Sequence, residues 1–130
     1  MVRSTSAPAK DVMKLGGPAL RTFFNLAKTW NLTEREQMRL LGLASRSTLH
    51  AWKSGRVTKV SRDTMERISY LLGIFKAINI LLPDAQRADE WVRLPNAAPL
   101  FGGRSALDRM TTGNIGDLYV VRQYLDAQRG

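Results

Sequence analysis

The sequence contains no cysteine and a single histidine among its 130 residues. The absence of cysteine excludes disulfides and cysteine-ligated zinc, and it fits a reducing compartment, so we expect a cytoplasmic protein. The lone histidine is accompanied by no phosphate-binding GxxxxGK[ST] loop and by no paired carboxylates at a telling helical spacing. We therefore predict that the chain is not an enzyme and uses no metal ion and no cofactor.

Long apolar runs are also missing. The longest, ISYLLGIFKAINILL at residues 68–82, is too short to cross a hydrocarbon core of about 30 Å and contains Lys76 and Asn79. Residues 1–15 lack the unbroken apolar stretch of a secretion signal. We expect no association with a membrane. A hydrophobic content of 44% and a charged content of 24% indicate a globular chain, either one domain or two small ones that share a core.

Acidic residues are scarce in the first half of the chain. Residues 1–60 hold 11 Lys and Arg against 3 Asp and Glu, a net charge of +8, whereas residues 61–130 hold 9 against 8, a net charge of +1. A cationic surface attracts nucleic acid, because each neutralised phosphate releases condensed counterions. The first half is therefore the candidate for binding an anionic partner. The alternative is a cationic surface that serves only solubility.

Helices joined by a glycine turn are predicted in this basic half. Residues 18–30 carry apolar side chains at helical spacing, and a capping box formed by Thr33 and Glu36 begins a second helix. Gly42 ends that helix, because glycine adopts the positive φ of a helix end at little cost. A third helix follows over residues 46–54. Helix, glycine turn and helix together are typical of a helix-turn-helix.

The third predicted helix has the two faces that reading DNA requires. Leu49 and Trp52, three positions apart, face inward, so the polar residues project from the opposite side. Arginine can bind guanine in a bidentate manner, serine and histidine can bind base edges, and lysine suits the phosphates. The alternative is an ordinary solvated face. The predicted DNA-binding residues are Arg46, Ser47, Thr48, His50, Lys53, Arg56 and Lys59.

A long apolar helix is predicted from Ser61 to Pro83. Its apolar side chains cover so much of its circumference that several sides must be packed against other surfaces. We favour a homodimer over an entirely internal core helix. Gly73 would allow another helix to approach closely. The residues assigned to the dimer contact are Ile68, Leu71, Leu72, Phe75 and Ile78.

The remaining sequence predicts shorter helices around an irregular loop. Asp84 caps one helix, a loop rich in Pro and Gly runs over residues 95–103, Ser105 caps a short helix, and residues 115–129 form the last one. No strand-like alternation is present, so the predicted fold is all-α: a helix-turn-helix bundle followed by a second helical domain. The predicted divisions are a flexible tail (1–15), the helix-turn-helix domain (16–60) and the second domain (61–130).

Three motifs in the second domain occur in a characteristic order: WVRLPN at residues 91–96, FGGRSALDRM at 101–110 and LYVVRQYLD at 118–126. This arrangement resembles the toxin-binding domain of Xre/MbcA/ParS-type antitoxins, which are partners of RES-domain toxins. Those toxins attack NAD or use it for ADP-ribosylation. The resemblance covers residues 61–130, and the first half resembles the Xre-like DNA-binding region of the same family.

The resemblance implies that the second domain dimerises and occludes the toxin's NAD pocket, and that the first domain represses its own operon at an inverted-repeat operator. The alternative function is a stand-alone dimeric transcription regulator without a toxin partner. Trp91 and Phe101 could equally be buried beneath the loop and hold it in place. The residues that the resemblance assigns to toxin binding are Trp91, Arg93, Asn96, Phe101, Arg122, Tyr124, Gln128, Arg129 and Gly130.

Overall fold

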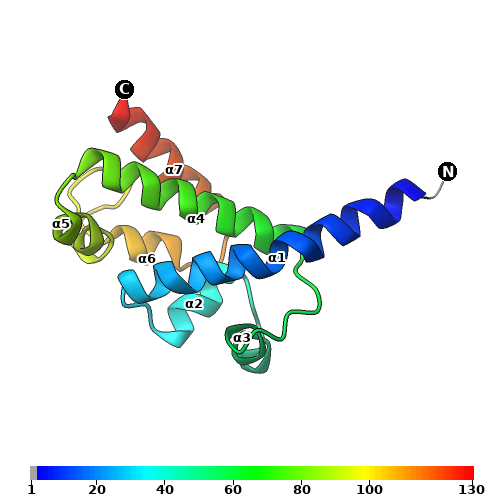
Figure 1. Ribbon diagram of the computed structural model, residues 1–130. Coiled ribbons are helices and arrows are strands. Elements are labelled where there is room, and N and C mark those ends of the chain that lie inside the picture. The colour runs from blue at the N-terminus through cyan, green and yellow to red at the C-terminus, as the bar shows by residue number, and fades with distance from the viewer. Residues whose placement is uncertain (1–2) are drawn as a thin grey trace.

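The computed structural model describes residues 3–130, with side chains from residue 16 onward. The predicted tail, residues 1–15, lies outside the residues whose side chains are described. Within residues 3–130 the chain is all-α, as predicted, and its one β pairing is an isolated bridge between Pro95 and Ser105 (Figure 1). The elements are α1 (Arg3–Thr29), α2 (Glu34–Leu41), α3 (Arg46–Lys53), α4 (Arg62–Leu81), α5 (Ala85–Glu90), the 3₁₀ helix η1 (Trp91–Arg93), α6 (Ala106–Met110) and α7 (Ile115–Arg129).

Local capping sets the boundaries of the helix-turn-helix. The predicted capping box is present: the Thr33 hydroxyl accepts from the Glu36 backbone N–H at 3.1 Å, and the Glu36 carboxylate accepts from the Thr33 N–H at 2.8 Å. Gly42 ends α2 with φ of +72°, a left-handed conformation that favours glycine. The hydroxyls of Ser45 and Ser61 cap α3 and α4. These four boundaries are fixed by neighbouring residues in the sequence.

The central helix is α4, which packs most extensively on α7 and next on α1 (Figure 1). The chain's own helices therefore cover most of the predicted dimer surface. Leu72 is half-buried, and Phe75 packs against Trp30 with ring centroids 6.2 Å apart. Side chains buried in the chain's own core are closed to a second copy, which favours the alternative of an internal core helix for three of the predicted contacts. Those at most 1% exposed are Ile68, Leu71 and Ile78.

Gly73 allows the predicted close approach, and the group that approaches belongs to α7. A Cβ atom placed at Gly73 would overlap the guanidinium of Arg122. That guanidinium crosses α4 at this point and forms an ion pair with Asp126 at 3.2 Å. Gly73 therefore leaves room on α4 for the side chain of Arg122.

Arg67 of α4 ties the helix-turn-helix to the second half of the chain. Its side chain is almost buried and forms an ion pair with Asp63 at 2.8 Å. The same guanidinium donates to the carbonyl oxygens of Arg39, at the end of α2, and of Gly113, before α7, at 3.3 and 2.9 Å. One side chain thus satisfies backbone acceptors from both halves, which holds them in a fixed relation.

None of the helices in the described part is long and apolar enough to span a membrane.

Candidate functional site

The outward face of α3 is held in position by two buried side chains. Leu49 is fully buried and Trp52 is 7% exposed, so both face inward as predicted. The opposite side of α3 and the segment that follows it therefore face solvent. Of the predicted DNA-binding residues, Thr48 is half-buried, and the six that are exposed are Arg46, Ser47, His50, Lys53, Arg56 and Lys59.

A carboxylate on α2 organises this face. Glu34 accepts a hydrogen bond from Arg46 Nε, and its other oxygen lies 2.7 Å from His50 Nε2. The hydrogen bond with His50 lowers the pKa of Glu34 below the ordinary 4.5; desolvation opposes this shift and Arg46 adds to it. Because Glu34 holds only Nε, the two terminal nitrogens of Arg46 stay available for a guanine. Sequence reasoning missed Glu34, since its partners lie 12 and 16 positions away.

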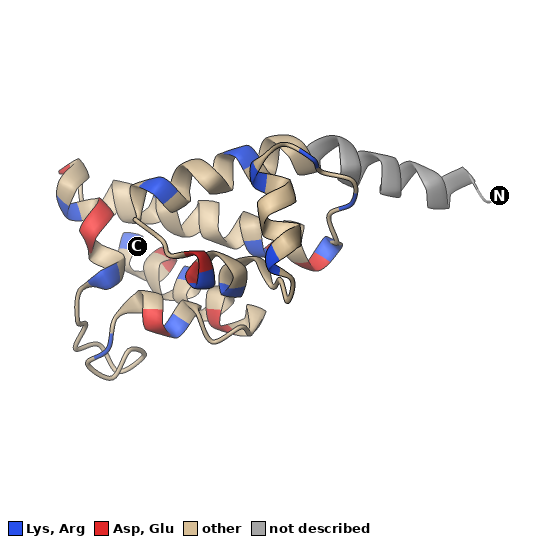
Figure 2. Ribbon diagram, turned by 90° about the horizontal axis from the view of Figure 1, so that it is seen from below, with Lys and Arg blue, Asp and Glu red and all other residues tan. Residues whose placement is uncertain are grey.

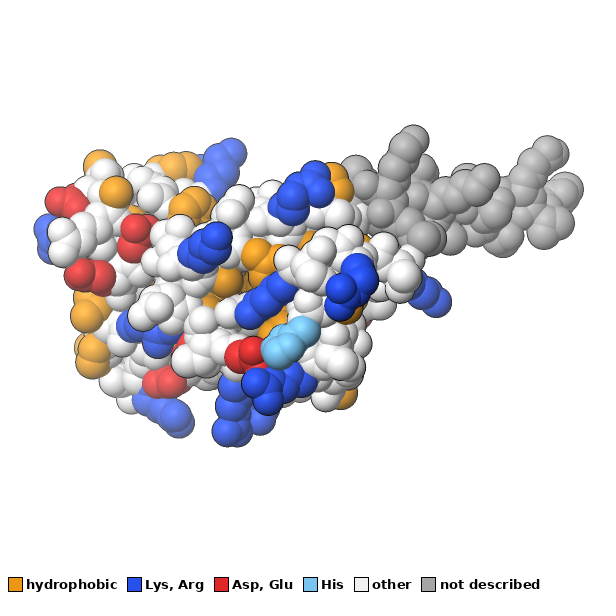
Figure 3. Space-filling model, turned by 60° about the horizontal axis from the view of Figure 1, so that its bottom comes forward, with side chains coloured by type: hydrophobic (Ala, Val, Ile, Leu, Met, Phe, Trp, Pro, Cys, Tyr) orange, Lys and Arg blue, Asp and Glu red, His pale blue; other side chains and the backbone are white. Residues whose placement is uncertain are grey.

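The surroundings of this face are mainly cationic. Figure 3 shows the single histidine with one acidic side chain against it and Lys and Arg side chains on several sides. Seen from below in Figure 2, Lys and Arg are spread along the whole ribbon, with Asp and Glu among them. Residues 46–60, which form α3 and the segment after it, nevertheless carry four exposed cations and no Asp or Glu.

A second surface is built around three aromatic side chains. Phe101 packs edge-to-face against Trp91 and Tyr124, with ring centroids 6.0 and 5.2 Å apart. Phe101 is 4% exposed, so it fixes the loop on η1 and α7 and has almost no surface to offer a partner. This burial favours the alternative that Phe101 anchors the loop over the prediction that it contacts toxin. Trp91 and Tyr124 are only half-buried and keep one side open.

Asn96 holds the same loop. Its backbone N–H donates to Arg104 at 3.0 Å, its carbonyl accepts from Gly103 at 2.9 Å, and its side-chain oxygen accepts from Ala98 at 2.9 Å. These bonds close the loop beside the bridge between Pro95 and Ser105. Asn96 is therefore a loop-forming residue in this structure.

Arg93 points away from the aromatic cluster and toward the helix-turn-helix. Its guanidinium donates to the carbonyl oxygens of Trp30 and Asn31 at 3.1 and 2.6 Å and forms an ion pair with Glu36 at 2.9 Å. Burial raises the pKa of Glu36, but the hydrogen bonds from the Thr33 N–H and from Arg93 outweigh it, so the pKa lies below 4.5. The structure therefore places Arg93 between the two halves of the chain.

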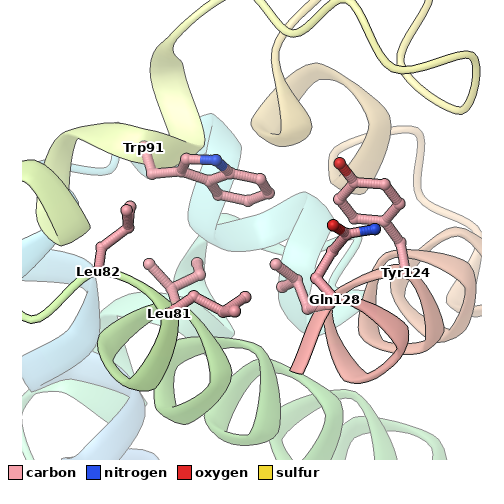
Figure 4. Close-up of a pocket in the computed structure, with 7 residues that line it drawn as sticks. Leu81, Leu82, Trp91, Tyr124 and Gln128 are labelled. Carbon is pink, nitrogen blue, oxygen red and sulfur yellow. The ribbon is translucent and has the colours of Figure 1, made fainter. Parts of the chain in front are cut away.

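A groove opens between the end of α4, η1 and the end of α7. We call it the C-terminal groove; it has a volume of about 220 Å³. Figure 4 shows Trp91 above Leu81 and Leu82, with Tyr124 and Gln128 of α7 on the other side. An apolar cavity of about 150 Å³ can hold benzene, so this groove can receive an aromatic or branched aliphatic side chain. Its lining residues are Ile78, Leu81, Leu82, Trp91, Tyr124, Leu125 and Gln128.

The structure divides the predicted toxin-binding residues into separate groups. Trp91, Tyr124 and Gln128 meet in the C-terminal groove, and the exposed Arg129 and Gly130 follow directly after it on the chain. The remaining four lie elsewhere: Arg93, Asn96, Phe101 and Arg122. The sequence did not assign the groove's leucines to a binding site, because their helical spacing is equally compatible with a core position and with a dimer contact. Among the described residues, no group of three His, Cys, Asp or Glu could hold a metal ion.

Comparison with known proteins divides the chain at α4. Residues 13–73 match the model of a family described as the antitoxin Xre-like helix-turn-helix domain. Residues 77–130 match that of the antitoxin Xre/MbcA/ParS C-terminal toxin-binding domain. The chain is also 47% identical over 126 residues to the uncharacterized protein y4oB of Sinorhizobium fredii (strain NBRC 101917 / NGR234), covering 96% of this chain and 94% of that protein.

Proposed function

Because the chain belongs to the Xre/MbcA/ParS family of antitoxins, we propose that it neutralises a RES-domain toxin with its C-terminal half and represses its own operon with its N-terminal half. Membership of this family points to a regulatory protein rather than an enzyme. The observation that carries the proposal is the separation of two surfaces. In Figure 1, α3 lies at the bottom of the molecule and the end of α7 lies at the top, so DNA and toxin need not compete for space.

Neutralisation is proposed to work by occlusion. A side chain of the toxin enters the C-terminal groove beside Trp91, and this anchor places Gln128, Arg129 and Gly130 over the toxin's NAD pocket. A RES-domain partner is favoured by the resemblance of the three C-terminal motifs, and the half-open aromatic wall of the groove suits an apolar anchor. Blocking a pocket requires no chemistry from this chain.

Repression is proposed to need two copies of the chain. A homodimer presents two α3 helices and predicts an inverted-repeat operator, with half-sites about 34 Å or a multiple apart. Most of the apolar face of α4 lies inside the core, so few large apolar side chains are open to a second copy. Among residues 16–130 the exposed ones are Ile80, near the end of α4, Leu94 and Tyr119.

Co-expression in bacteria tests the toxin half. Cells that produce the cognate RES-domain toxin are expected to survive with the wild-type chain and with Gln123→Trp, but to die with Gln128→Trp. Gln128 is exposed and lines the C-terminal groove, so an indole there fills it. Gln123 is exposed on α7 outside the groove and serves as the matched control. Equal death with and without the wild-type chain would refute the antitoxin role.

Binding to the DNA upstream of the operon tests the other half. Wild-type protein is expected to prefer this duplex over a scrambled one, and Arg46→Ala is expected to remove about 1–3 kcal/mol of that preference. Arg35→Ala, an exposed cation of α2, is the control. Binding without sequence preference would contradict repression. A chain that binds the duplex specifically and leaves the toxin active would instead be the stand-alone regulator.

A further inference from the structure

A hollow lies beside α3, and Lys53 is the one lining residue to which a function has been assigned above. It lies between α1 and the end of α3 with the turn that follows, and has a volume of about 580 Å³. We call it the α1–α3 groove. Leu20 and Phe24 of α1 and Trp52 of α3 contribute its apolar lining. Because Leu20 and Trp52 are also part of the core, this lining is fixed by the packing of α1 on α3.

The polar lining of the α1–α3 groove carries positive charge only. Arg21 stands on the α1 side and Lys53 on the α3 side, both exposed, and Asn25 adds a side-chain amide next to Arg21. No Asp or Glu lines the groove. Neither cation takes part in an ion pair within the part of the chain whose side chains are described. Two unneutralised cations on opposite sides of a hollow favour an anionic occupant.

We propose that the α1–α3 groove binds the sugar–phosphate backbone of DNA, so that α1 contributes to the interface through Arg21 and Asn25. This inference rests on the proposed DNA binding by α3. Cations match phosphates, and the apolar lining suits the deoxyribose between them. Recognition in the groove is independent of sequence, in contrast to Arg46 at the other end of α3.

The spacing along α3 supports this placement. Arg46 and Lys53 lie seven positions apart, about two helical turns, so their side chains project from the same face of α3. When Arg46 at the start of α3 reaches base edges, Lys53 at its end therefore meets the strand that borders the groove. Arg21 lines the far side of the same hollow, so a strand bound at Lys53 would also meet Arg21.

Salt dependence of DNA binding separates this inference from the function on which it rests. Fluorescence anisotropy with the full-length protein would measure affinity for the upstream and scrambled duplexes across salt concentrations. Each lost phosphate contact lowers the slope of log K against log[salt] by about 0.9. Arg21→Gln and Lys53→Gln are each expected to lower it by that amount on both duplexes and to leave the sequence preference intact. Arg87→Gln, an exposed cation of α5, is the control.

The outcomes are distinct. A wild-type protein that binds the upstream duplex, together with an Arg21→Gln slope equal to that of Arg87→Gln, overturns the groove assignment alone. A wild-type protein that binds neither duplex overturns the proposed DNA binding and this inference with it. Sedimentation of the variants without DNA tests whether a second copy of the chain occupies the groove instead. A change of oligomeric state without a change of slope would assign the groove to that second copy and overturn the proposal.

Discussion

Arg93 joins the two halves of the chain, and its replacement by alanine is expected to destabilise the fold. Its guanidinium lies 3.1 and 2.6 Å from the carbonyl oxygens of Trp30 and Asn31 and 2.9 Å from the carboxylate of Glu36. Carbonyl groups at the end of a helix lack intrahelical donors, and Arg93 supplies donors to two of them at the end of α1. Removing the side chain leaves these acceptors to water and separates η1 from α1.

The size of the effect follows from these contacts and from exposure. A hydrogen bond from a charged donor contributes about 1.5–3 kcal/mol when buried, but the side chain of Arg93 is 40% exposed, so about 1 kcal/mol for each carbonyl is more realistic. The ion pair with Glu36 adds at most about 1 kcal/mol. Arg93→Ala is therefore expected to lower the free energy of unfolding by about 2–3 kcal/mol. Arg93→Lys should recover only part of this, because lysine lacks the planar fork.

Urea unfolding followed by tryptophan fluorescence, at one fixed protein concentration, measures this difference. The control is Arg104→Ala: that side chain is 77% exposed and 3.8 Å from Asp108, so a change of less than about 0.5 kcal/mol is expected. The reasoning is refuted if Arg93→Ala keeps the wild-type unfolding midpoint and loses binding to the toxin. That result would mean that Arg93 contacts the toxin, as the sequence motif implied.

Three further predictions concern Glu36 and two glycines. The stability that the lowered pKa of Glu36 provides is present above pH 4.5 and is lost as the pH falls through the folded-state pKa. In Glu36→Gln the free energy of unfolding should therefore fall less in acid than in the wild type. Urea titrations at a series of pH values measure this difference. Gly42→Ala should cost about 1–2 kcal/mol in the same assay, because φ is +72° and the new Cβ would lie 2.7 Å from Arg67 Nε; an unchanged midpoint would contradict this. Gly73→Ala should change stability by less than about 1 kcal/mol, since higher helix propensity offsets the displacement of Arg122. Its test is the NMR resonance of Arg122 Nε, which should shift; an unmoved signal would contradict the close packing.

The features that sequence predicted well are those set by neighbouring residues. The capping box of Thr33 and Glu36 is present, as is the left-handed turn at Gly42. The inward direction of Leu49 and Trp52 also follows from their spacing on one helix. Each depends on contacts or backbone angles within a few positions, so the local sequence contains the information.

The features that sequence could not settle depend on distant packing. Periodicity showed that the long helix needed cover, but not that α7 and α1 of the same chain would provide it. Arg93 was assigned to the toxin from its motif, whereas its partners lie 57 to 63 positions away. The role of Glu34 could not be predicted, because it depends on α2 bringing this residue against Arg46 and His50. In each instance the residue type was informative, and the partner was supplied by the tertiary fold.

The central claim is that this chain silences a toxin by covering its NAD pocket, and the most direct measurement is the rate of NAD loss with purified RES-domain toxin as full-length chain is added. The rate is expected to fall to background once the chain is in excess, and to remain high with Gln128→Trp. An undiminished rate with excess folded wild-type chain would contradict the account.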